Sequence, residues 1–244
     1  MPHMTGKIIV GEHIMKNAQE FLSGAFSLEL LYSFVIIVCS LMIYFGTKEI
    51  YELSNHKGLK YFRRAFLFFA IAYFFRSFIK FFLVYFDAST ALNLSPRLFY
   101  RILGQTTLFI FIYFSSMAIF YLLYSVMWKK WKKEKTLIYL LHAFAIFLSF
   151  ISILGKNPLI YLFSNIILFF FALAIVIISH KDKKKSHKNN LYVTYLLLFI
   201  FWILNIIDIL IPDFLKTFQL LIYLSSSGIF LLILYKVIKN TGTN

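Results

Sequence analysis

The sequence predicts an all-α protein, a polytopic bundle of seven transmembrane helices with its N-terminus outside and its C-terminus in the cytoplasm. Three observations support this. Of the 244 residues, 61% are hydrophobic and 14% are charged, whereas soluble domains are about 45–50% apolar and about 25% charged. Seven apolar stretches each have about 20 residues, enough to cross a hydrocarbon layer of ~30 Å as a helix. Finally, lysine and arginine are abundant in every second loop only.

The seven predicted helices are joined by short connections and use nearly all of the chain. Their ranges are 28–47, 65–86, 98–127, 137–154, 158–179, 191–211 and 217–236. The membrane domain is therefore expected at 28–236. An extracytoplasmic segment at 1–27 precedes it and a short cytoplasmic tail at 237–244 follows. We expect an integral, multi-pass protein of the cell membrane.

Local features fit several of these elements. The first stretch contains Cys39, the one cysteine, which we interpret as a small packing residue because a single thiol forms no internal disulfide. Trp128 and Trp131 follow the third stretch, as expected for aromatic residues at a membrane interface. Pro158 opens the fifth stretch and Pro212 follows the sixth, both at positions that tolerate proline.

The basic loops predict the orientation of the bundle. Five Lys or Arg residues accompany the loop after each of the first, third and fifth stretches: Lys48, Lys57, Lys60, Arg63 and Arg64; Lys129, Lys130, Lys132, Lys133 and Lys135; Lys181, Lys183, Lys184, Lys185 and Lys188. Cytoplasmic loops carry such an excess, and they attract anionic lipid headgroups. The formal charge of +15 is thereby explained without nucleic acid, for which the assigned helices leave no recognition fold.

Two cations interrupt the apolar run YFRRAFLFFAIAYFFRSFIKFF at 61–82, namely Arg76 and Lys80. Counted from Ala65 at 1.5 Å per residue, Arg76 lies about 16 Å deep. A charge at such a depth costs about 2.5–3.5 kcal/mol on insertion scales. Arg76 and Lys80 are four residues apart and share one helix face. We therefore expect both to meet partners inside the bundle.

The predicted partner is Asp208, three residues after Asn205 on the sixth stretch. Asp208 is expected in the outer half of the membrane, at a depth compatible with Arg76. A structural ion pair and a ligand site are both open interpretations, because intramembrane charges serve either role. Other polar residues are expected at similar depth on the third and seventh stretches. The predicted ligand-binding residues are Arg76, Lys80, Asn205, Asp208, Arg101, Gln105, Gln219 and Tyr223; Arg101 also fits an interfacial anchor.

Motifs of catalysis are missing from the sequence. It has no P-loop, no CxxC and no HExxH, and the SSSG at 225–228 is not a GxSxG nucleophile elbow. His142 is the one histidine inside the predicted helices, so we expect no metal site of convergent ligands. The sequence therefore predicts a protein that is not an enzyme.

The helix count and the N-outside orientation resemble the layout of microbial rhodopsins and of heptahelical receptors. The resemblance is limited to this topology, and it includes no sequence motif. Retinal proteins of that class hold their chromophore through a lysine in the middle of the last helix, whereas the corresponding stretch LIYLSSSGIFLLILY at 221–235 has none. We therefore expect neither a retinal Schiff base nor another cofactor.

The distribution of polar residues favours a sensor. Polar residues gather in the outer halves of the helices, and the inner halves, such as 196–201 and 229–235, are apolar. This pattern predicts a receptor-like protein that binds a small polar or anionic ligand in an outward-facing pocket and signals through a separate cytoplasmic partner. Two alternatives remain: a small-solute transporter, possibly of a 3+1+3 arrangement, and a scaffold subunit whose charges are structural pairs.

Overall fold

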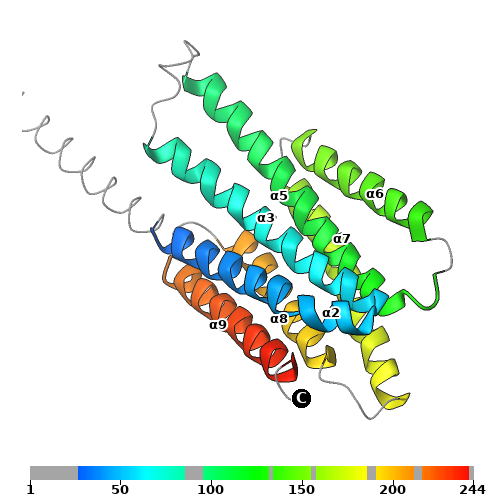
Figure 1. The fold of residues 1–244 in the computed structure, drawn as a ribbon. Helices are drawn as coiled ribbons and strands as arrows, with labels where there is room; N and C mark the ends of the chain where they lie inside the picture. Colours follow the sequence, from blue (N-terminus) through cyan, green and yellow to red (C-terminus); the bar gives the residue numbers. More distant parts are fainter. Residues whose placement is uncertain are drawn as a thin grey trace, which may run out of the picture.

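The computed structural model describes residues 27–85, 96–131, 134–154, 158–185, 191–211 and 216–241, and all regular structure in these ranges is helical. A helix at 27–46, called the first helix below, is followed by seven others (Figure 1). They are α2 (Lys48–Ser54), α3 (Lys57–Tyr85), α5 (Pro96–Met127), α6 (Glu134–Leu154), α7 (Pro158–Lys185), α8 (Leu191–Leu210) and α9 (Lys216–Thr241). The predicted all-α bundle is confirmed.

Within the described residues, six helical segments are long and apolar enough to cross a membrane, with the first helix and α2 counted as one: Ser27–Ser54, Arg101–Met127, Lys135–Leu154, Leu159–Lys181, Leu191–Leu210 and Phe218–Lys239. The other predicted span, α3, has 29 residues and is about 44 Å long, but Arg63, Arg64 and Arg76 interrupt its apolar residues. It nevertheless lies along α5 inside the bundle (Figure 1). The chain is therefore a multi-pass helical protein, while its orientation and the membrane that holds it remain predictions.

Several helix boundaries differ from the sequence prediction. Helix α3 already begins at Lys57 and α9 continues to Thr241, because lysine is a good helix former and the backbone bonds extend past the apolar run. The short helix α2 was not predicted. It follows a turn at Thr47, whose hydroxyl donates to the Ile43 carbonyl at 2.7 Å, and it ends at Asn55 in the left-handed conformation. Its seven residues are too few for a hydropathy pattern.

Aromatic rings fill the centre of the bundle. Phe69 of α3, Phe201 of α8 and Phe230 of α9 are all buried. Their rings meet edge to face, with centroids 4.6 Å apart for Phe201 and Phe230 and 6.4 Å apart for Phe69 and Phe201, a favoured geometry for aromatic pairs. Other large apolar side chains, Phe34 among them, are exposed on the outer faces, as expected of a surface that meets lipid.

The side chain of Arg63 links α3 to the first helix at the end of the first helix that precedes α2. This side chain is buried, and its Nε donates to the Tyr44 carbonyl at 3.0 Å. The guanidinium carbon also lies 4.9 Å from the ring centroid of Tyr44 and 5.5 Å from that of Tyr51. A cation that caps the last turn of a helix and contacts two aromatic faces is well compensated. The junction of the first helix with α2 is thus held by α3.

His56 directly precedes α3 at the same end of the bundle. Its Nδ1 accepts a hydrogen bond from the backbone N–H of Leu59 at 3.3 Å, which satisfies one of the unpaired donors of a helix N-terminus. The ring packs edge to face on Trp128, with centroids 4.9 Å apart. Partial burial, and then the charge of Lys129, lower the pKa of His56. This lowered pKa favours the neutral imidazole, whose Nδ1 can accept a hydrogen bond.

Gly58 allows α3 to approach the end of α5, and replacing it tests this contact. A Cβ at position 58 would lie 2.9 Å from the Ser125 carbonyl oxygen and 2.9 Å from Cδ1 of Trp128. We expect Gly58→Ala to lower the midpoint of thermal unfolding in detergent, at a cost of about 1–3 kcal/mol for overpacking. The control is Gly228→Ala, because nothing lies within 4 Å of the Cβ position there. Equal midpoints for the two variants would contradict the close packing.

Candidate functional site

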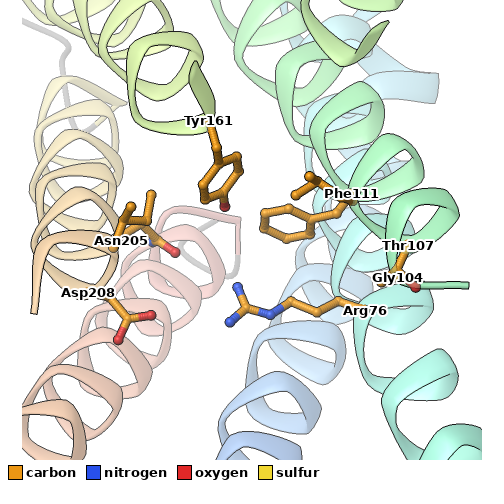
Figure 2. Close-up of a pocket in the computed structure, with 9 residues that line it drawn as sticks. Arg76, Gly104, Thr107, Phe111, Tyr161, Asn205 and Asp208 are labelled. Atoms are coloured by element: carbon orange, nitrogen blue, oxygen red, sulfur yellow. The ribbon is translucent and has the colours of Figure 1, made fainter. Parts of the chain in front are cut away.

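A partly open cavity of about 310 Å³ lies between α3, α5, α7 and α8 (Figure 2). This volume is at the lower end of the range of roughly 300–1,000 Å³ that is typical of small-molecule pockets. Charged, polar and aromatic side chains all contribute to its walls. The lining residues are Arg76, Gly104, Thr107, Leu108, Phe111, Tyr161, Asn205, Asp208 and Ile209.

Arg76 carries the positive charge of the cavity wall. Its Nε and Nη2 donate to Oε1 of Glu29 at 3.0 and 2.7 Å, and the two side chains are 17% and 15% exposed. The guanidinium carbon lies 5.1 Å from the ring centroid of Phe111, within the range of a cation–π contact. The cation is thus paired on one side, stacked on another and directed into the cavity (Figure 2).

The expected ion pair between Arg76 and Asp208 is wrong, because Arg76 pairs with Glu29 of the first helix. The first helix runs antiparallel to α3, and one turn further along both helices the hydroxyls of Tyr32 and Tyr73 are 3.1 Å apart. This register places Glu29 level with Arg76. The prediction rested on the similar membrane depths expected for Arg76 and Asp208. A similar depth does not show which helix lies next to α3. Asp208 lines the opposite wall of the same cavity (Figure 2).

A chain of hydrogen bonds lies one helical turn from the ion pair and joins three helices. The Tyr73 hydroxyl donates to Oδ1 of Asn205 at 3.0 Å, so the Tyr32 hydroxyl is the donor in its bond with Tyr73. Nδ2 of Asn205 in turn donates to the Phe201 carbonyl at 2.9 Å. Tyr32, Tyr73 and the cavity residue Tyr161 were not among the site residues predicted from the sequence. Tyrosines within an apolar run look like packing residues until their hydroxyls are seen to converge.

Gln219, Tyr223, Arg101 and Gln105 are not among the residues that line the cavity. Nε2 of Gln219 donates to the Tyr223 hydroxyl at 3.0 Å, and the Tyr223 ring stacks on Tyr32 with centroids 4.7 Å apart. This pair therefore supports the tyrosine network from α9. Arg101 and Gln105 are exposed near the beginning of α5. The backbone of Lys80 belongs to α3, and its side chain lies outside the described part of the structure. Ligand binding by these residues stays a prediction.

A second, much smaller cavity lies in the half of the bundle nearer α2. Its volume of about 10 Å³ is about the space of a single water molecule, and residues such as Phe69, Tyr195 and Trp202 line it. The Tyr195 hydroxyl is 3.0 Å from that of Ser125. The Trp202 ring N–H donates to the backbone carbonyl of Asn165 at 3.2 Å. The large cavity thus has an apolar, closely packed floor.

The cavity is equipped to bind a charged or polar group. It offers a guanidinium, a carboxylate, an amide and a phenol within an otherwise apolar wall. Within the described ranges, no group of three His, Cys, Asp or Glu side chains is placed to hold a metal ion. His142 lies elsewhere, between α5 and α6, where its Nδ1 is 2.8 Å from the Tyr113 hydroxyl.

The substitution Tyr73→Phe tests the hydrogen-bonded chain. It removes the bonds to Tyr32 and Asn205 and keeps the ring. Bonds of this kind between membrane helices contribute about 0.6 kcal/mol on average and up to about 1.7 kcal/mol. We therefore expect the midpoint of thermal unfolding to fall measurably. Tyr139→Phe is the matched control, since Tyr139 is 72% exposed. If both variants unfold at the wild-type temperature, the chain does not stabilise the bundle.

Comparison with known proteins places the chain in a family. No family model matches it, and no solved structure matches it. It is 31% identical over 212 residues to an uncharacterised protein of the archaeon Archaeoglobus fulgidus, and the match covers 86% of this chain and 91% of that protein. The chain therefore belongs to the same family as this archaeal protein.

Proposed function

We propose that this chain is a membrane sensor of the receptor-like kind, which binds a small polar ligand in an outward-facing cavity. The observation that carries the proposal is the cavity of about 310 Å³ with the guanidinium of Arg76 in its wall. Ionisable groups within membrane helices are costly, and they commonly mark ligand or ion sites. The cavity has the size, the polar groups and the apolar surface that such a site needs.

The ion pair at the cavity couples ligand binding to helix movement in this proposal. A ligand that competes with Glu29 for Arg76 loosens the contact between the first helix and α3. The other end of these helices is held by the bond from Arg63 to the Tyr44 carbonyl, so the pair separates at the cavity end only. The ligand shifts this equilibrium because it binds the separated state better. The first helix thereby tilts about the held end, and a cytoplasmic partner responds to this tilt.

The packed floor of the cavity favours a sensor over a transporter. A transporter exposes its binding site to the two membrane faces in turn, whereas the second cavity, which lies toward α2, has space for about one water molecule. The basic ends of the helices support contact with anionic lipid or with an acidic partner. Lys129, for example, lies over Trp128 with its Nζ 5.6 Å from the ring centroid, at a predicted interface.

Thiol labelling tests whether the cavity opens outward. Cys39 is the one cysteine of the sequence, so Thr107→Cys in a Cys39→Ala background places a single thiol in the cavity wall. We expect a charged methanethiosulfonate reagent to modify this thiol from the external side of sealed vesicles. Adding Gly104→Leu should slow the reaction several-fold by filling the cavity. Gly228→Leu is the control, because both glycines have open space at the Cβ position and only Gly104 lines the cavity.

Two results would count against the sensor. Modification of the Thr107→Cys thiol from the internal side alone would contradict an outward-facing cavity. Concentrative uptake of a labelled solute into proteoliposomes, abolished by Arg76→Ala, would show that the chain transports its ligand.

A further inference from the structure

The cavity presents both signs of charge on facing walls. The guanidinium of Arg76 projects from α3, and the carboxylate of Asp208 projects from α8 on the other side (Figure 2). From this arrangement we infer the class of the ligand: a small zwitterion, specifically an amino carboxylate with an apolar side chain. The inference rests on the proposed function, in which this cavity is the ligand site, and it narrows the ligand to one chemistry.

Arg76 has donors left for the carboxylate of such a ligand. A guanidinium carries five N–H donors, and the two bonds to Glu29 come from Nε and Nη2. Three N–H groups remain, two on Nη1 and one on Nη2, and one from each nitrogen shares the outer edge of the guanidinium. This end of the side chain points into the cavity in Figure 2. Two parallel N–H donors on one planar edge match the two oxygens of a carboxylate. A ligand carboxylate therefore binds Arg76 beside Glu29 or in its place.

Asp208 and its neighbours suit the ammonium end. An ammonium is a compact donor of three N–H bonds and needs acceptors around it. The wall opposite Arg76 supplies the carboxylate of Asp208, the side-chain carbonyl of Asn205 and the hydroxyl oxygen of Tyr161. All three are labelled on one side of the cavity in Figure 2. In an α-amino carboxylate the amino nitrogen is three bonds from each carboxylate oxygen, so both charged groups fit within one small cavity.

A ligand with one sign of charge fits less well. A simple anion brings its charge close to the carboxylates of Glu29 and Asp208, and a simple cation brings its charge close to Arg76. These like-charge contacts are strong where water is largely excluded. A zwitterion places each charge next to an opposite one and leaves the net charge of the cavity unchanged. The charges of the site thus favour the zwitterion over both of its single-charge analogues.

The rest of the wall determines the side chain of the ligand. Leu108, Phe111 and Ile209 make an apolar surface next to the charged groups. The volume of about 310 Å³ admits a ligand of amino-acid size. An aliphatic or aromatic side chain buries its surface against these residues.

Two matched sets of probes test the inference by calorimetric titration of the whole chain in lipid nanodiscs. The first set is phenylalanine, phenethylamine and hydrocinnamate, which share one skeleton and carry both charges, the positive charge alone and the negative charge alone. The second set is leucine, isoamylamine and isocaproate. In at least one set, we expect the zwitterion to bind about tenfold tighter than either analogue, the usual effect of one charged hydrogen bond.

Two charge-neutralising variants separate the roles of the walls. Asp208→Asn should weaken binding of the zwitterion and leave the affinity for the anionic analogue unchanged or raised. Arg76→Gln should weaken the zwitterion and spare the cationic analogue. The control is Glu52→Gln, since Glu52 is an exposed carboxylate on α2 and its removal should change no affinity. The wild-type probe series is decisive by itself if either variant fails to fold.

Each other outcome overturns the inference. Tightest binding by an anionic analogue, or by a cationic one, shows a ligand of single charge and leaves the proposed sensor intact. Equal affinities within both sets show that charge does not select the ligand. Binding by none of the six probes also rejects this ligand class, and the outward labelling of Thr107→Cys then decides separately whether the cavity is a site at all.

Discussion

The ion pair between Arg76 and Glu29 is the contact on which the rest of the structure depends. An arginine among apolar helices is tolerated only with a compensating partner, and Oε1 of Glu29 accepts two of its hydrogen bonds, the shorter at 2.7 Å. This pairing fixes how the first helix lies against α3. The same register brings Tyr32 to Tyr73, and through Tyr73 it reaches Asn205 on α8. The pairing of the Arg76 charge thus brings together side chains from three helices beside one cavity.

The two ends of the bundle differ in the surroundings of an arginine of α3. Arg63 at one end is buried against two tyrosine rings and a helix terminus, and the interior near it is packed with aromatic and aliphatic side chains. Arg76 at the other end faces open space. The first helix and α3 are held together at one end by Arg63. At the other end an ion pair joins them, and a charged ligand can compete for it. This arrangement is suited to respond to a ligand. This asymmetry is the physical basis of the proposed sensor.

The sequence predicted the helices and part of the site, for identifiable reasons. Apolar stretches of about 20 residues are a strong pattern, so the bundle was predictable, whereas the seven-residue α2 was not. Arg76, Asn205 and Asp208 were grouped by their depth, and all three line the cavity. The partner of Arg76 was missed because depth does not reveal which helices are neighbours or how each is rotated. Tyr73 was missed because its role lies in a hydroxyl contact between helices.

A double-mutant cycle on the ion pair tests the central claim most directly. The free energy of unfolding in mixed micelles is measured for Glu29→Leu, Arg76→Met, the double variant and the wild type. We predict that each single change lowers it by about 3–5 kcal/mol, because it leaves one buried charge without its partner, while the double variant stays close to wild type. Additive losses in the double variant would contradict the account, since they would show that Arg76 and Glu29 stabilise the bundle independently of each other.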